Sequence, residues 1–222
     1  MSKAAVQLAP ALDRNDRRRQ RTRQAILKAA SEIFREKGVA ATVVTDITTR
    51  ADVAYGSFYK YFKSLDDVVE VLAEGVFERL VERTREIMNG VDDLEVLPCV
   101  GARVLMRIIL GDPASRWLLD RPDMFIGKFR AIGSPYMLAS EREAVEAGRL
   151  RPAGGHDAWL RSMPWILLCE LRHAVETGRY LEHEETFALI SLRLLGINDA
   201  TADALLARSE ELVHAHGINS QR

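Results

Sequence analysis

Residues 53–62, with the sequence VAYGSFYKYF, hold side chains that can bind nucleic acid. The segment contains three tyrosines, two phenylalanines and one lysine, and it directly follows the polar run TDITTRAD. Lysine ammonium and tyrosine hydroxyl groups bind phosphate oxygens, while tyrosine rings can contact sugars and base methyl groups. Exposed aromatic rings are unfavourable in water unless they meet a partner, so the cluster predicts a surface that contacts duplex DNA.

Helical periodicity around this segment indicates how the rings are presented. Apolar residues repeat at three- and four-residue spacing over residues 22–37, and shorter helices fit residues 43–51 and 54–62. In the last of these, Phe58 and Phe62 share one face and can pack on the two earlier helices. Two short helices joined by a tight turn predict a helix-turn-helix, whose later helix enters the major groove.

The remaining side chains of the third helix face outward or lie at its margins. These are Tyr55, Ser57, Tyr59, Lys60 and Tyr61. Gly56 has no side chain and lets this turn of helix approach its target closely. For Tyr59 and Tyr61, partial packing in the core is the alternative to a phosphate contact.

The charge distribution supports a polyanionic partner for the first part of the chain. Residues 1–63 contain 13 Lys/Arg and 6 Asp/Glu, a net charge of +7, whereas residues 64–222 contain 18 and 26, a net charge of −8. A basic segment joined to an acidic one is expected if only the first binds DNA. Residues 1–19 are predicted to be a flexible basic arm in which Arg17, Arg18 and Arg19 reach DNA, or a solvated tail without ordered contacts.

The sequence offers no pattern for catalysis or for a bound cofactor. The five histidines lack metal-ligand spacing, and we find no nucleophile elbow, phosphate-binding glycine loop or dinucleotide fingerprint. Catalytic residues, metal and cofactors are therefore predicted to be absent. Two distant cysteines, Cys99 and Cys169, and the lack of a signal peptide or long apolar run predict a cytoplasmic protein without a membrane partner.

Beyond the third helix the chain is predicted to be helical throughout. Ser64 and Asp67 resemble a capping box at the start of a long helix over residues 65–88. Glycine and proline then separate further helical segments. These cover residues 92–110, 114–120, 123–132, 135–148, 157–177, 182–195 and 199–215.

Residues 20–72 resemble the DNA-binding domain of the TetR family of bacterial transcriptional repressors. The resemblance lies in a phenylalanine before a Glu-Lys-Gly turn, a threonine-containing second helix, the Gly-Ser-Phe-Tyr-x-Tyr-Phe third helix and the Ser-x-x-Asp cap. Asp52 stands where the family usually has glycine in the turn, Ala54 replaces a frequent serine cap, and Leu65 replaces a phosphate-binding lysine. Asp tolerates the left-handed backbone region better than most residues, so the turn is expected to survive.

The resemblance implies specific roles in DNA binding. Bases would be read by Tyr55, Gly56 and Ser57, with Lys60 as a further candidate. Phosphates would be held by Thr45, Tyr59 and Tyr61, and Lys63 or Lys60 would replace the missing lysine. Arg50 could face either the DNA backbone or solvent.

The resemblance also implies that the acidic remainder senses a ligand and forms a dimer. Large side chains scattered among small residues can line an apolar pocket, although each is more often ordinary core. The candidates are Arg103, Met106, Trp117, Phe125, Phe129, Tyr136, Met137, Trp159, Met163 and His173. Helices over 157–177 and 182–195 carry apolar residues around much of their circumference, which predicts that they pair with a second copy.

Taken together, we expect an all-α fold with three parts. These are the arm over residues 1–19, a three-helix helix-turn-helix domain over 20–64, and a larger helical effector-binding and dimerisation domain over 65–222. The predicted function is a homodimeric repressor of palindromic operator DNA, released by a small, largely apolar effector. The alternatives are a regulator that activates or needs no effector and, more remotely, a small-molecule carrier or an enzyme.

Overall fold

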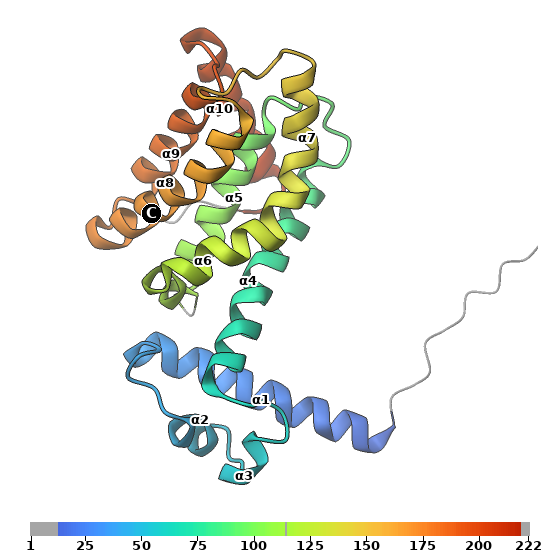
Figure 1. Cartoon of the computed structure of the whole chain (residues 1–222), viewed down its shortest axis with the longest axis vertical. Coiled ribbons are helices and arrows are strands. Elements are labelled where there is room, and N and C mark those ends of the chain that lie inside the picture. Colours follow the sequence, from blue (N-terminus) through green and yellow to red (C-terminus); the bar gives the residue numbers. More distant parts are fainter. Residues whose placement is uncertain (1–12, 114, 219–222) are drawn as a thin grey trace, which may run out of the picture. The chain divides into compact units, whose positions relative to one another are not determined.

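The computed structural model describes residues 13–113 and 115–218, and gives only the backbone of residue 134 and of residues 136–140. All regular secondary structure in these ranges is helical, as Figure 1 shows. The chain forms two compact units, Met1–Val68 and Val69–Arg222, here called unit 1 and unit 2. The all-α fold class is thus as predicted.

The first helix, α1 (Arg14–Lys37), begins eight residues before the predicted start at Thr22. Asp13 precedes it and accepts a hydrogen bond from the backbone of Arg14, and Asp16 lies in its first turn, where a negative charge is favourable. Arginine and glutamine are also good helix formers. The part of the basic arm that the structure describes, including Arg17, Arg18 and Arg19, is therefore helical and exposed, which corrects the prediction of a flexible arm there.

The second helix, α2 (Val44–Arg50), packs on α1 and is capped by a side chain of its own first turn. Thr42 does not cap it, because its hydroxyl donates to the carbonyl of Gly38 at 2.7 Å. Instead, the carboxylate of Asp46 accepts from the backbone N–H of Val43 at 2.9 Å. Lys37 of α1 contacts the same carboxylate at 2.6 Å, which lowers the pKa of Asp46.

The third helix, α3 (Tyr55–Phe58), is shorter than the predicted residues 54–62. Ala54 offers no capping side chain, and after Phe58 the chain tightens into turns. The amides of Lys60 and Tyr61 donate to the carbonyls three residues earlier, at 3.2 and 2.9 Å. Phe58 and Phe62 are nonetheless buried, as predicted, with ring centroids 5.8 Å apart.

Asp52, in the turn between α2 and α3, has a φ of 53°. It is the only described residue other than glycine with a positive φ. The left-handed backbone expected at this position is confirmed.

The fourth helix, α4 (Leu65–Met88), has the predicted bounds and begins in unit 1. Ser64 accepts from the amide of Asp67 at 3.2 Å, and the carboxylate of Asp67 accepts from the amide of Lys63 at 2.7 Å. The predicted capping arrangement is therefore present, with the return bond made to Lys63.

Unit 2 continues from α4 as a bundle of helices. Its elements are α5 (Leu97–Gly111), η1 (Arg116–Asp120), α6 (Pro122–Lys128), η2 (Phe129–Gly133), α7 (Ser134–Glu146), α8 (His156–Thr177), α9 (Tyr180–Leu194) and α10 (Asp199–Ala215). η1 is a 3-10 turn and η2 is a π-helical turn that joins α6 to α7 without a break. The segment before α5, residues 92–96, was predicted to be helical and is not.

Helix α5 is the centre of unit 2 and packs against α7, α8, α9 and α10. Nearly all of its residues are buried, including two arginines one helical turn apart, Arg103 and Arg107. Both contact Glu184 of α9, at 2.5 Å from Arg103 and 2.6 Å from Arg107. Glu210 of α10 contacts both guanidinium groups from its partly exposed side. This network pairs the charges that would otherwise be costly inside the bundle.

None of the helices that the structure describes combines the length and the apolar character needed to span a membrane.

The left-handed residue in the turn of unit 1 leads to a first prediction. Asp52→Ala should lower the free energy of unfolding by about 1 kcal/mol, because alanine lacks the polar side chain that eases a positive φ. Asp52→Gly should not lower it, because glycine adopts this backbone freely. Urea unfolding followed by circular dichroism measures both. Equal stability of the two variants would contradict the role assigned to the turn.

Candidate functional site

Two tyrosines dominate the exposed surface of α3. Tyr55 is 53% exposed and Tyr59 is 49% exposed. Their rings meet edge to face at 5.5 Å, and their hydroxyl oxygens are 3.0 Å apart. This hydrogen bond, in which either hydroxyl can be the donor, is the main reason why the pKa of Tyr59 is raised. The hydrogen bond and the ring contact thus hold the two tyrosines together as a pair at the surface.

The other predicted DNA-binding residues surround this pair. Thr45, Gly56, Lys60 and Lys63 are exposed, whereas Ser57 and Tyr61 are half-buried. A Cβ atom added to Gly56 would meet nothing within 4 Å, so the space above this turn of α3 is open. Gly56 and Ser57 lie on α3, Lys60, Tyr61 and Lys63 follow it, and Thr45 lies on α2, which packs against α3. Arg17, Arg18 and Arg19 lie on the first turns of α1.

Arg50 has a role that the sequence left open. Its guanidinium forms two hydrogen bonds with Glu36 of α1, at 2.9 and 2.8 Å, and lies 3.5 Å from Glu32. The hydrogen bond to Glu36 is the main reason why the pKa of Arg50 is raised. Arg50 thus joins α2 to α1 within unit 1.

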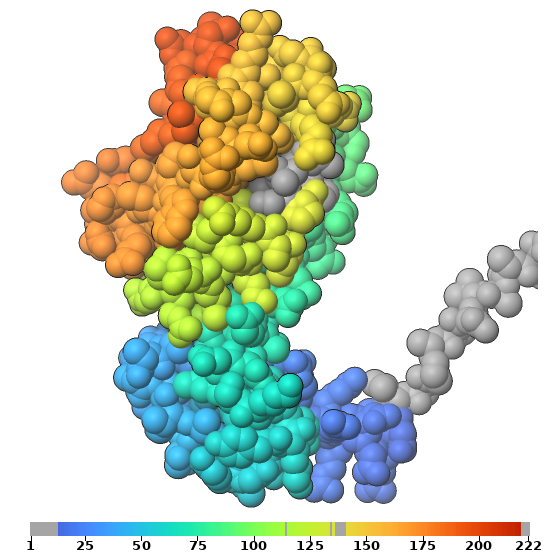
Figure 2. Space-filling model, in the orientation of Figure 1, coloured from blue at the N-terminus to red at the C-terminus, as the bar shows by residue number. Residues whose placement is uncertain are grey.

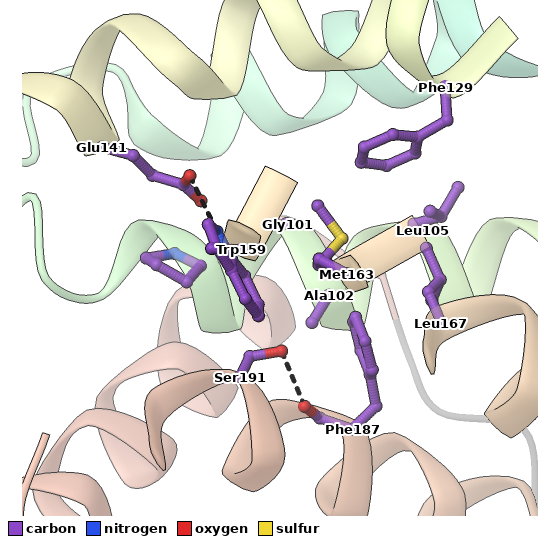
Figure 3. Close-up of a pocket in the computed structure, with 11 residues that line it drawn as sticks. Gly101, Ala102, Leu105, Phe129, Glu141, Trp159, Met163, Leu167, Phe187 and Ser191 are labelled. Carbon is purple, nitrogen blue, oxygen red and sulfur yellow. Dashed lines mark hydrogen bonds between the residues drawn. The ribbon is translucent and has the colours of Figure 1, made fainter. Parts of the chain in front are cut away.

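Unit 2 contains a largely apolar pocket between α5, α7, α8 and α9 (Figure 3). The space inside it is about 280 Å³ in total, but only about 10 Å³ admits the centre of a water molecule. In this state the pocket holds about one water molecule, and a larger guest must displace side chains. It is lined by Pro98, Gly101, Ala102, Leu105, Phe129, Glu141, Trp159, Met163, Leu167, Phe187 and Ser191.

Glu141 supplies the one acidic side chain of this lining. It is 1% exposed, and its Oε2 accepts a hydrogen bond from the indole N–H of Trp159 at 3.1 Å. Figure 3 shows the two side chains pointing toward each other. The other oxygen, Oε1, is buried and has no hydrogen-bond partner among the described residues. Burial raises the pKa of Glu141 to about 7, against a smaller opposing effect of the Trp159 hydrogen bond.

His156, the first residue of α8, lies beside this carboxyl group. Its Nε2 is 3.6 Å from Oε2 of Glu141, which is too long for a hydrogen bond, and has no partner among the described residues. Burial and the nearby Arg142 lower the pKa of His156, which favours its neutral form. A neutral histidine does not compensate a negative charge on Glu141.

The predicted effector residues separate into several environments. Phe129, Trp159 and Met163 line the pocket. The side chains of Tyr136 and Met137 lie outside the described part of the structure. Met106, Trp117 and Phe125 are buried away from the pocket lining.

The two charged candidates are also elsewhere. Arg103 faces away from the pocket, because it lies about 160° around α5 from Gly101 and Leu105 and about 100° from Ala102. There it binds Glu184. His173 is exposed on α8 and pairs with Glu176 at 3.0 Å.

Sequence reasoning missed Glu141, His156 and Ser191. In the run SEREAVEAG, Glu141 looks like an ordinary exposed charge. The one signal is its three-residue spacing from the buried Ala144, which places both on the inner face of α7.

The comparisons with known proteins agree with this description of unit 1. Residues 26–72 match the family described as bacterial regulatory proteins, tetR family. This part of the chain is thus similar to the DNA-binding part of TetR-family regulators. The transcriptional repressor KstR2 of Mycobacterium tuberculosis H37Rv is 35% identical over 65 residues, which are 29% of this chain and 32% of the repressor. KstR2 of Rhodococcus jostii RHA1 is 34% identical over 89 residues, 40% of this chain and 43% of that protein.

The chain spans about a third of the length of the first relatives that it matches. Solved structures extend the likeness to the fold of the rest. RolR in complex with its ligand resorcinol has a TM-score of 0.71 at 22% identity, covering 86% of this chain and 96% of RolR. The fatty acid degradation regulator FadR from Bacillus halodurans has a TM-score of 0.60 at 19% identity, covering 79% and 95%. At these identities the likeness shows the fold alone.

The buried carboxyl group leads to a second prediction. The folded chain keeps a proton on Glu141 up to a pH of about 7, whereas an ordinary glutamate releases it near 4.5. Through this group, the free energy of unfolding should fall by up to about 3 kcal/mol as the pH rises from 4.5 to 7, and then level off. Glu141→Gln should lack this decrease, so it should gain stability relative to the wild type between pH 5 and 8.

Urea unfolding at pH 5 and at pH 8 measures the difference in the free energy of unfolding between Glu141→Gln and the wild type. Glu143→Gln, an exposed position on the same helix, is the matched control and should follow the wild type. The same pH dependence in Glu141→Gln as in the wild type would contradict the raised pKa.

Proposed function

We propose that the protein is a homodimeric TetR-like transcriptional repressor that binds a palindromic operator and is released by a small, largely apolar effector. The observation that carries the DNA-binding part is the exposed, hydrogen-bonded pair of Tyr55 on α3 and Tyr59 directly after it, within the residues that match the TetR family. KstR2, a relative that matches part of this chain, is named as a transcriptional repressor.

In this proposal α3 enters the major groove of the operator. Tyr55, Gly56 and Ser57 contact base edges, while Tyr59 and the exposed lysines Lys60 and Lys63 bind phosphates. Because two-fold symmetric proteins bind two half-sites, the α3 helices of a dimer would lie about 34–36 Å apart, one turn of the DNA helix.

The effector is proposed to bind in the pocket around Trp159 and Met163. A protein of the same fold, RolR, is described in complex with the ligand resorcinol. An effector can shift the protein only by binding one state more tightly than the other. Helix α4 is the proposed connection, since it begins in unit 1 and continues into unit 2.

The proposed dimer forms through α8 and α9. Among the described residues of unit 2, the large apolar side chains that are most exposed lie on these two helices (orange in Figure 2). They are Trp165, Val175, Leu181 and Leu189. Trp165 is 49% exposed and Leu181 is 45% exposed, and an interface would remove these surfaces from water.

One observation favours a regulator that needs no effector. The pocket of unit 2 is nearly filled by its own side chains, with room for about one water molecule. Under this second candidate function, DNA binding would not respond to any pocket ligand.

A third prediction tests the DNA-binding surface. Gly56→Ala should keep or raise the free energy of unfolding, by up to about 1 kcal/mol, because the added methyl group meets nothing and alanine favours helix. The same methyl group should block close approach to DNA and weaken binding about tenfold or more. A gel shift with duplex DNA from upstream of the protein's own gene measures the affinity.

Gly127→Ala is the matched control, because a Cβ at Gly127 in unit 2 also meets nothing within 4 Å. It should leave DNA binding unchanged. Tyr55→Ala should weaken binding without unfolding the protein. Wild-type affinity in both Gly56→Ala and Tyr55→Ala would refute the assignment of α3.

A fourth prediction concerns assembly. Trp165→Asp combined with Leu189→Asp should convert the dimer into a monomer, because a charge would be buried on each side of the interface. Sedimentation velocity measures the mass. Ala204→Asp, at an exposed position of α10, is the control and should remain dimeric. A dimeric double variant would exclude α8 and α9 as the interface.

A further inference from the structure

We propose that Glu141 is the polar anchor of the pocket and selects an uncharged effector with a hydroxyl group on a single aromatic ring. The inference deepens the proposed function and rests on it, since it names the chemical class that the pocket takes. Four features of the pocket lead to this class: the free carboxyl oxygen, the lack of a cationic partner, the aromatic lining and the limited space.

The carboxyl group of Glu141 is only half satisfied. Trp159 donates to Oε2, while the buried Oε1 has no partner among the described residues. A buried polar atom without a hydrogen bond destabilises the fold by about 1–3 kcal/mol, and such atoms are few in proteins. A ligand hydroxyl at Oε1 would remove this cost. Binding energy is therefore available at this one point of an otherwise apolar pocket.

The surroundings exclude charged ligands. Among the described residues, the lining contains no Lys or Arg, and His156 beside the carboxyl group favours its neutral form. An anionic ligand would meet a carboxyl group without a compensating cation, and an ammonium ligand would lose its hydration among apolar side chains. A hydroxyl group avoids both costs. It can donate to an ionised Glu141 or accept from a protonated one, so it suits either state.

The shape and size of the lining favour one aromatic ring. Phe129, Trp159 and Phe187 surround the space from three different segments, and rings stack or meet edge to face with a planar ligand (Figure 3). The space that admits a water-sized guest is about 10 Å³, well below the roughly 150 Å³ of apolar cavity that accommodates benzene, so a ligand of one ring is the largest that a modest side-chain movement would admit. Entry therefore requires a side chain to move. Met163 is suited to this, because its thioether is flexible.

The test measures binding to the full-length protein in the absence of DNA. Isothermal titration calorimetry would compare phenol with toluene, benzoate and benzylammonium, which keep the ring but replace the hydroxyl with a methyl group, an anion or a cation. Phenol should bind at least about tenfold more tightly than toluene, the value of one net hydrogen bond. Benzoate and benzylammonium should bind more weakly than phenol.

Glu141→Leu keeps the volume but removes the hydrogen bond, so phenol and toluene should bind to it equally. Glu141→Gln can still form the hydrogen bond and should retain a preference for phenol. Glu143→Leu is the matched exposed control and should behave as the wild type. Circular dichroism establishes that each variant is folded. If Glu141→Leu does not fold, the preference of Glu141→Gln for phenol over toluene is the test of the inference.

Three results would overturn the inference. The first is equal binding of phenol and toluene to the wild type, or tighter binding of either charged probe. The second is a phenol preference that survives in Glu141→Leu, or that is lost from Glu141→Gln. The third is no binding of phenol at millimolar concentration. None of these depends on DNA, so failure here is distinguishable from failure of the gel shift.

Discussion

Two buried arginines on one side of α5 impose the main constraint on unit 2. Arg103 and Arg107 lie in the centre of the bundle, where an unpaired guanidinium would destabilise the fold by several kcal/mol. Glu184 from α9 and Glu210 from α10 therefore have to lie against α5. The same network leaves the opposite side of α5 to small residues. That side is where the pocket forms.

The two buried glutamates of unit 2 show how burial alone does not define a role. Glu184 is bound by two guanidinium groups and is fully engaged in holding α9 against α5. Glu141 has one indole N–H and a neutral imidazole nearby, with one oxygen unused. The first arrangement is complete without a ligand, whereas the second is not. This contrast is the physical reason to look for recognition at Glu141 rather than at the larger ionic network.

The sequence predicted unit 1 better than unit 2 because the signals of unit 1 are local. The Phe58–Phe62 spacing, the Ser64–Asp67 cap and the left-handed Asp52 each involve neighbours in sequence. Their geometry therefore follows from helix and turn rules. The length of α3 was overestimated, since periodicity does not reveal where a helix without a cap tightens into turns.

In unit 2 the decisive contacts join residues far apart in the chain. Arg103 meets Glu184 and Ser209, and Trp159 meets Glu141 from another helix. Nothing in the periodicity of α5 distinguishes an arginine that faces a ligand from one that faces a glutamate. Large apolar residues were easier to place, and Phe129, Trp159 and Met163 do line the pocket. Helices were thus predictable from local pattern, but their mutual rotation was not.

That rotation depends on the π-helical turn η2, which joins α6 to α7. A π-helical turn accommodates one residue more than an α-helical turn, and each helical residue advances by about 100° around the axis. Loss of a single residue from Phe129–Gly133 would therefore turn the whole of α7 by about that angle. The Glu141 carboxyl would swing away from Trp159 while the helices kept their lengths. A one-codon deletion in this turn would thus change the lining of the pocket without shortening any of the helices around it.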